Sequence, residues 1–350
     1  MERSFMKNKT SVNMTSWMGR VDHEDGEFGL RWHQKVKAAN STNQDGIMLL
    51  GFACDEGVIR NKGRKGAYAA PQVIRRALAN LAWHHQSDVY DGGDIQCNDG
   101  DLELAQKQLG IKIKSALANR HQVIVLGGGH EVAWGSFQGI ARYLQNRAVL
   151  TSPITPPRIG IINFDAHFDL RNLPQSPSSS TSQLSKQYGS SGTPFHQISE
   201  FCHVQHWPFN YACLGLNKGS NTQALYHKAK QLGVLHFDDI EMNLLNLPQI
   251  KQALSEFIEQ NDFLYLTIDV DVFPASCAPG VSAPAVHGVS LDIIESLLPD
   301  ILKAKNQHGE SKLLLADLAE FNPTFDIDNQ TARLVARLVW TISHGMKPNM

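Results

Sequence analysis

Short apolar runs recur along the chain and are separated by stretches of mixed polarity. Within most runs the apolar residues are continuous rather than alternating, which is typical of strands buried on both faces of a sheet. We predict eight such strands, at 46–52, 88–91, 122–127, 158–164, 211–216, 234–237, 263–269 and 312–318.

Helical periodicity fills most of the intervals between these strands. We predict helices at 101–118, 131–146, 222–232, 248–260, 290–305 and 328–344. Strands that alternate with helices predict right-handed βαβ crossovers, and hence an α/β fold with a mostly parallel sheet.

Two segments lie outside this alternation. Residues 1–45 are polar and predict an N-terminal extension, which leaves 46–350 as a single catalytic domain. Residues 172–194 are rich in Ser, Pro and Gly and predict a long loop. Because long loops in compact domains are often functional, we expect this one to form a mobile rim that orders over a substrate.

Composition narrows the class of protein. Of the 350 residues, 42% are hydrophobic and 19% are charged, which predicts a substantial core. The net charge of −2 gives no reason to expect nucleic acid or an anionic membrane as a partner. No apolar run approaches the length of a membrane span, and the first residues lack the apolar region of a secretory signal. The five scattered cysteines have no CxxC spacing, so we expect reduced thiols and a cytoplasmic location.

Three of the predicted strands end in residues that bind metals. In chain order these are His130, then Asp165, His167 and Asp169, then Asp269 and Asp271. Ligands of open α/β sheets bind at the carboxyl ends of the strands, so all six side chains are expected at one edge of the sheet. The alternate spacing within the second and third groups points side chains the same way.

Four carboxylates and two imidazoles are too many ligands for one tetrahedral zinc. Shared out with bridging carboxylates, they suit two divalent ions about 3.5–4 Å apart. Oxygen and nitrogen ligands without thiolate favour Mn²⁺, although ligand type alone leaves Fe, Co, Ni and Zn open. Each group taken singly also suits a turn or a surface loop. Three such groups, each after an apolar strand, favour a metal site.

A fourth strand is followed by Glu320, in "LLLADLAEFNP". A carboxylate at this position suits two roles. It can cap the backbone locally, or it can lie on the floor of a pocket and select a cationic substrate group. The spacing alone leaves both roles open.

Together these segments resemble the ureohydrolase family of arginases and agmatinases. "GGGHE", "NFDAHFD" and "TIDVDVFPASCAPGVSAPA" are similar to its three metal motifs, and "AEFNP" is similar to its C-terminal acidic motif. "GFACDEGVIRNKGRKGAYAAPQVIRRAL" resembles its N-terminal signature. The resemblance implies one three-layer α/β/α domain with an eight-stranded, mostly parallel sheet. It also implies hydrolysis of a guanidine or amidine C–N bond at a dinuclear manganese centre.

The resemblance also implies roles for individual residues. One Mn²⁺ would be held by His130, Asp165, Asp169 and Asp269, and the other by Asp165, His167, Asp269 and Asp271. Asp165 and Asp269 would then bridge the two ions and hold the hydroxide that attacks the amidine carbon. Glu320 would orient the cationic group of the substrate through charge-assisted hydrogen bonds.

Two departures from arginases favour the formimidoylglutamase branch of the family. Ser191 stands where arginases carry a His, and Arg171 stands where they carry an Asn that contacts the substrate. "WMGRVDHEDGEFGLRWHQ" and "GGGHEVAWG" also resemble that branch. The implied substrate is N-formimidoyl-L-glutamate, which is cleaved to glutamate and formamide in histidine breakdown. We expect Arg171 to bind one carboxylate, because Arg pairs with carboxylates bidentately. Arg60 and Arg64 are weaker candidates for the other, and a structural role suits them equally.

Other readings stay open at this point. A sister hydrolase would act on a guanidino acid such as guanidinobutyrate, or on agmatine or arginine. A non-catalytic metal-binding relative has no reason to keep the complete ligand set. A deacetylase of similar fold would need only one zinc and fewer acids. The expected partner is a small molecule, an amidine-bearing dicarboxylate, and a homo-oligomer is left open.

Overall fold

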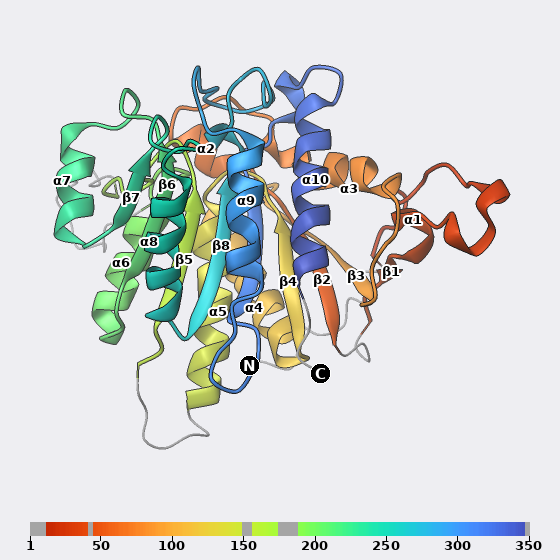
Figure 1. Cartoon of the computed structure of the whole chain (residues 1–350), viewed down its shortest axis with the longest axis horizontal. Helices are drawn as coiled ribbons and strands as arrows, with labels where there is room; N and C mark the ends of the chain where they lie inside the picture. Colours follow the sequence, from red (N-terminus) through yellow and green to blue (C-terminus); the bar gives the residue numbers. More distant parts are fainter. Residues whose placement is uncertain (1–11, 41–44, 149–155, 174–187, 347–350) are drawn as a thin grey trace.

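One parallel sheet forms the centre of the molecule. The computed structural model describes residues 12–40, 45–148, 156–173 and 188–346. In the described residues, nine strands pair in the order β1–β3–β2–β4–β9–β8–β5–β6–β7 (Figure 1). They are β1 (Lys37–Ala38), β2 (Gly46–Ala53), β3 (Val89–Gln96), β4 (His121–Leu126), β5 (Ile159–Phe164), β6 (Asn210–Leu216), β7 (Leu235–Asp238), β8 (Phe263–Asp269) and β9 (Leu313–Ala319).

Helices cover both faces of this sheet (Figure 1). One face carries α3 (Ala70–Ala79), α8 (Leu247–Glu259), α9 (Leu291–Leu302) and α10 (Gln330–Gly345). The other carries α4 (Leu102–Ala118), α5 (Val132–Ala148), α6 (Pro194–Gln205) and α7 (Gln223–Gln231). Short helices complete the connections: α1 (Trp32–Lys35), α2 (Glu56–Arg60), η1 (His23–Phe28), η2 (Ala67–Ala69), η3 (Val270–Val272) and η4 (Pro323–Phe325). The three-layer α/β/α prediction is confirmed.

The central strands are apolar throughout because both faces are buried. In β2, Ile47 and Leu49 join the core under α3 and α10, whereas Met48, Leu50 and Phe52 join the core under α4 and α5. Successive side chains of a strand point to opposite faces, so each layer receives every second residue. This explains why the runs read as continuous rather than alternating.

The prediction of eight strands is wrong by one. The ninth, β1, is a two-residue edge strand in which Lys37 pairs with Tyr90 of β3. Both of its residues are exposed, so no apolar run marks it in the sequence. The same N-terminal segment also reaches the core, where the rings of Trp17 and Trp32 are buried.

Four α-helices lie where no helix was predicted. They are α1, α2, α3 and α6, and none is longer than 12 residues. The last begins at Pro194, inside the predicted 172–194 loop, with Pro in the first turn, where its missing N–H costs nothing. Residues 174–187 of that loop lie outside the described residues, so its predicted mobility stays a prediction.

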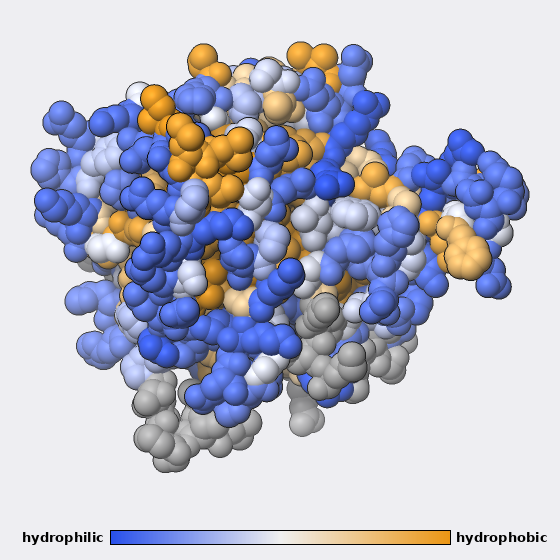
Figure 2. Space-filling view, in the orientation of Figure 1, coloured by the Kyte–Doolittle hydropathy of each residue, from blue (hydrophilic) through white to orange (hydrophobic). Residues whose placement is uncertain are grey.

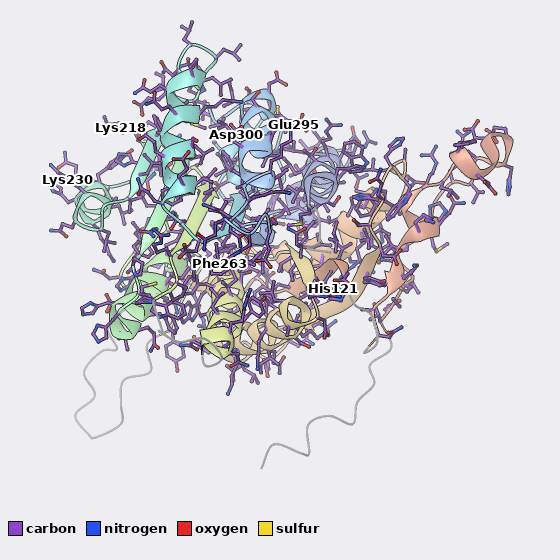
Figure 3. All side chains as sticks on the ribbon, turned by 60° about the horizontal axis from the view of Figure 1, so that its bottom comes forward. His121, Lys218, Lys230, Phe263, Glu295 and Asp300 are labelled. Carbon is purple, nitrogen blue, oxygen red and sulfur yellow. The ribbon has the colours of Figure 1, made fainter. Side chains whose placement is uncertain are left out.

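Figures 2 and 3 show the surface of the molecule and the edge of the sheet at which the strands begin. Hydrophilic residues cover most of one face, and the apolar side chains visible there gather mainly near its upper edge (Figure 2). Figure 3 turns the opposite edge of the sheet forward, where His121 and Phe263 open β4 and β8. All five cysteines are unpaired. No helix within the described ranges is both long and apolar enough to cross a membrane.

Candidate metal centre

The predicted ligands meet at the carboxyl edge of four neighbouring strands. Strands β4, β9, β8 and β5 are consecutive in the sheet. His130 follows β4, Asp165 directly follows β5, and Asp269 ends β8. Glu320 directly follows β9, between them. Strand order, rather than sequence distance, therefore brings these side chains together.

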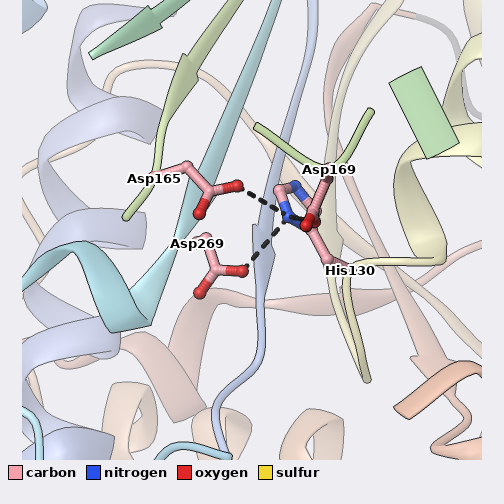
Figure 4. A group of neighbouring side chains, drawn as sticks. All are labelled: His130, Asp165, Asp169 and Asp269. Atoms are coloured by element: carbon pink, nitrogen blue, oxygen red, sulfur yellow. Dashed lines mark ion pairs between the residues drawn. The ribbon is translucent and has the colours of Figure 1, made fainter. Parts of the chain in front are cut away.

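One group of side chains surrounds the ring of His130 (Figure 4). Its Nδ1 lies 3.1 Å from Asp165 Oδ2, 2.9 Å from Asp169 Oδ2 and 3.1 Å from Asp269 Oδ2. This nitrogen is buried and makes no hydrogen bond to any described residue. A buried imidazole nitrogen that faces three carboxylate oxygens is a donor set that fits a divalent cation.

A second group lies beside the first and shares Asp165 with it. It consists of Asp165, His167 and Asp271. His167 Nδ1 lies 3.1 Å from Asp271 Oδ2 and 3.6 Å from Asp165 Oδ1. One oxygen of Asp165 thus faces each group, which is the geometry of a bridging carboxylate. Asp269 belongs to the first group and is not a member of the second.

Strand residues behind the ligands fix their orientation. Thr267 Oγ1 lies 3.0 Å from His130 Nε2, a hydrogen bond that leaves Nδ1 for a metal. Asn163 donates from Nδ2 to Asp165 Oδ2 at 2.8 Å. Such partners hold metal ligands in position and tune their basicity. The sequence analysis missed both residues, although each lies two positions before a predicted ligand.

Strained backbone also shapes the site. Asp169 has φ of 48° and Glu320 has φ of 63°, in the left-handed region that non-glycine residues rarely adopt. In the loop before His130, a Cβ on Gly128 would lie 1.8 Å from the Cys54 carbonyl oxygen, so only glycine fits. Strain of this kind clusters at functional sites, where the surrounding structure holds it in place.

The electrostatics of the cluster call for added positive charge. Burial, together with the charge of Asp165, raises the pKa of Asp169 to about 6. Burial and the charge of Asp271 raise the pKa of Asp269 well above its usual range. Burial lowers the pKa of His130, but the three surrounding carboxylates outweigh it and raise that pKa well above normal. The protein alone therefore retains protons in this cluster, and dications are the charges that would replace them.

Glu320 joins the cluster to the backbone of the first metal motif. Its Oε1 accepts a hydrogen bond from the His130 N–H at 2.8 Å. Burial and the charge of the neighbouring Glu131 raise the pKa of Glu320 to about 8. This carboxylate caps a backbone N–H and also lines the cavity described next, whereas its selection of a cationic substrate group stays a prediction.

A cavity of about 320 Å³ opens over the cluster. Its lining combines acidic and imidazole side chains of the cluster with cationic side chains: His167, Asp169, Asp269, Asp271 and Glu320 on one hand, and Lys62, Arg64 and Arg171 on the other. Ser191 also lines the cavity, and its Oγ accepts a hydrogen bond from Asn61 Nδ2 at 3.2 Å. The sequence analysis considered Arg60 and Arg64 but not Lys62, which lies between them.

Arg60 has structural partners and does not line this cavity. It forms ion pairs with Glu56 at 3.0 Å and Glu103 at 2.6 Å. It also donates to the carbonyl oxygens of Gly100 at 3.0 Å and Gly189 at 3.1 Å. These contacts favour the structural role over substrate binding.

Arg64 lines the cavity, but described residues already engage its guanidinium group. Its Nε donates to the Ser282 carbonyl oxygen at 2.9 Å, and Nη2 donates to the Val281 carbonyl oxygen. The same group lies 3.9 Å from the centre of the Phe325 ring. Arg64 therefore fastens the segment after η3 to the cavity wall.

Known proteins resemble this chain throughout its length. The model of the arginase family matches residues 45–344. The chain is 95% identical to formimidoylglutamase of Aliivibrio fischeri over 100% of both proteins. It is 61% identical to formimidoylglutamase of Photobacterium profundum over 96% of both. The crystal structure of Trypanosoma cruzi formiminoglutamase with Mn²⁺ shares the fold, with a TM-score of 0.72 and 23% identity over 90% of this chain and 98% of that one. The chain therefore belongs to the arginase family.

Proposed function

We propose that this enzyme hydrolyses N-formimidoyl-L-glutamate to L-glutamate and formamide. Water adds its oxygen to the formimidoyl carbon, the bond from that carbon to the glutamate nitrogen breaks, and this nitrogen takes a proton. The reaction fits the breakdown of histidine. The relatives named formimidoylglutamase support this assignment.

The polarity of the cavity is the observation that carries the proposal. Its buried end holds the carboxylates Asp269, Asp271 and Glu320, and its exposed side holds Lys62 and Arg171. A substrate with a cationic amidine at one end and carboxylates at the other matches this order of charges. Arginine and agmatine place less negative charge, or none, at the far end.

The residues of the two groups suit a pair of Mn²⁺ ions per chain. One ion would be held by His130, Asp165, Asp169 and Asp269, and the other by Asp165, His167 and Asp271, with Asp269 as a further shared ligand. The Mn²⁺ found in the Trypanosoma cruzi structure supports the choice of metal. When bound, two such ions make water acidic enough to supply hydroxide at neutral pH.

The surrounding side chains then position the substrate. Glu320 lies at the buried end of the cavity, where its carboxylate can accept hydrogen bonds from the amidinium group. Nearby dications favour its ionised form, against the effect of burial. Arg171 lies on the exposed side, two residues beyond Asp169, and can pair bidentately with a carboxylate. The cytoplasmic location stays a prediction.

A panel of substrates tests the proposed function. Manganese-loaded protein is given formimidoylglutamate, arginine, agmatine or guanidinobutyrate, and the amine product is measured at each concentration. We expect kcat/KM for formimidoylglutamate to exceed the others by at least about a hundredfold, because a site built for a substrate's charged groups rejects analogues that leave them unpaired.

A preference for guanidinobutyrate would instead establish a guanidino acid hydrolase. Turnover of no compound, with two ions bound per chain, would favour a non-catalytic metal-binding protein.

A further inference from the structure

The cavity changes charge between its buried and exposed parts. Asp269, Asp271 and Glu320 are nearly inaccessible, at 2%, 3% and 6% exposure. Lys62 and Arg171 line the same cavity and are exposed. A molecule that enters therefore meets positive charge first and negative charge at the candidate metal centre.

Lys62 differs from the arginines on either side of it. Arg60 is held by ion pairs outside the cavity, and Arg64 is held by carbonyl oxygens and an aromatic ring. No described residue lies within hydrogen-bond or ion-pair distance of the Lys62 ammonium group. Its charge is thus available to a ligand.

The backbone at Lys62 is unusual as well. Its φ is 63°, in the left-handed region where glycine is the residue of least strain. The strained turn is closed by a hydrogen bond from the Lys62 N–H to the Ile59 carbonyl oxygen at 2.9 Å. A lysine that is kept in a conformation suited to glycine points to a use for its side chain.

The segments that carry Lys62 and Arg171 meet at one point. Asn61, the neighbour of Lys62, donates from Nδ2 to Ser191 Oγ at 3.2 Å. A Cβ on Gly192 would lie 3.0 Å from Arg171 Cδ and 3.1 Å from Asn61 Oδ1, so this glycine separates the two segments. The Arg171 N–H also donates to the Gly192 carbonyl oxygen at 3.0 Å. Lys62 and Arg171 therefore stand on adjoining parts of the cavity wall.

We propose that Lys62 and Arg171 each bind one of the two carboxylates of the substrate. This inference rests on the proposed function, and it identifies Lys62 as a residue that determines specificity for a dicarboxylate. Lysine supplies a compact point charge, and arginine supplies a planar fork, so the two together can hold carboxylates in different orientations. Neither contact reaches the formimidoyl carbon, so both should act mainly on KM.

Kinetics with Lys62→Met test the inference. Methionine keeps most of the length of the side chain and leaves the strained backbone position without its charge. We expect kcat/KM for formimidoylglutamate to fall about ten- to a hundredfold, mostly through KM, as for the loss of a charged hydrogen bond. Arg171→Met should give a loss of similar size. Lys62→Arg should recover part of the rate, since it restores the charge.

Two substrates that lack one carboxylate make the test specific. N-formimidoyl-L-glutamine replaces the side-chain carboxylate by an amide, and N-formimidoyl-4-aminobutanoate lacks the α-carboxylate. The effect of Lys62→Met should vanish on one of these substrates, and the effect of Arg171→Met should vanish on the other. Equal losses on all three substrates would overturn the inference.

Lys65→Met is the matched control, because Lys65 is exposed on the same segment and does not line the cavity. It should leave the kinetics unchanged. Wild-type hydrolysis of formimidoylglutamate with unaltered kinetics in Lys62→Met would overturn the inference alone. Wild-type protein that leaves formimidoylglutamate intact would overturn the proposed function together with the inference.

Discussion

Two buried charge clusters lie in different halves of the sheet, and they differ in completeness. Beside β3, the Arg75 guanidinium donates to both carboxylate oxygens of Asp91, at 2.7 and 3.0 Å, and to Asp94 at 2.6 Å. The Trp17 indole donates to the same Asp91 at 2.7 Å. Every charge in this cluster has its partner within the chain.

The cluster at the ends of β4, β5 and β8 is incomplete by the same measure. Its carboxylates outnumber its imidazoles, and two buried atoms, His130 Nδ1 and Asp271 Oδ1, make no hydrogen bond to any described residue. Burying unpaired charge is costly unless a ligand pairs it. A closed cluster is therefore a structural element, and an open one marks a binding site. Four predictions test this distinction.

Asp165→Asn should have the largest effect, because this carboxylate faces both groups of the open cluster. Metal chemistry contributes several kcal/mol to a hydrolysis of this kind. We therefore expect kcat/KM to fall by at least about a thousandfold, equivalent to about 4 kcal/mol. Metal analysis after dialysis should find fewer than two ions per chain. Asp271→Asn alters only one group and should lower kcat/KM less, so it is the control. Normal metal content in Asp165→Asn would contradict the bridging role.

Arg75→Met should destabilise the fold without touching the chemistry. It leaves Asp91 buried without its cation, and breaking a buried ion pair in this way costs about 3–5 kcal/mol. Urea unfolding of the manganese-loaded protein measures the loss, and metal content and kcat of the folded fraction should stay at wild-type values. A drop in bound metal at unchanged stability would show that the closed cluster also serves the site.

Trp17→Phe removes one hydrogen bond to Asp91 and keeps most of the buried ring. A hydrogen bond to a charged group contributes about 1.5–3 kcal/mol, and we expect the free energy of unfolding to fall by that amount. The same urea titration measures it. An unchanged midpoint would mean that residues 12–40 dock onto the domain without help from this contact.

The pH dependence of the open cluster should be the smallest of the four effects. The metal-free pKa of Asp169 is raised to about 6, so its contribution to stability is present at low pH and is lost as the pH rises through about 6. Metal binding must displace that proton, which adds up to about tenfold in Mn²⁺ affinity per pH unit below pH 6. The pKa values of His130 and Asp269 are also raised, so the affinity should keep rising above pH 6 as their protons are lost. Titration calorimetry at several pH values measures this. An affinity independent of pH between 5 and 7 would contradict it.

The predictions from sequence succeeded where local pattern and sheet geometry suffice. Runs such as 122–127 and 263–269 mark buried strands, because only residues covered on both faces are apolar throughout. Parallel strands carry the residues that follow them to one edge of the sheet, so the sequence alone assigns His130 and Asp269 to one site. Family membership, and with it the expected chemistry, followed from the motifs at those strand ends.

Only the tertiary structure decided which residues pair with each charged side chain. Arg60, Lys62 and Arg64 look equivalent in the sequence. In the structure, Arg60 contacts Glu103 and Gly189, and Arg64 contacts Ser282. The ammonium group of Lys62 lines the cavity and has no hydrogen-bond or ion-pair partner among the described residues. These partners lie far away along the chain, and no local pattern encodes them. The edge strand β1 and the partners Thr267 and Asn163 were missed for the same reason, since a polar residue reveals its role only through what it contacts.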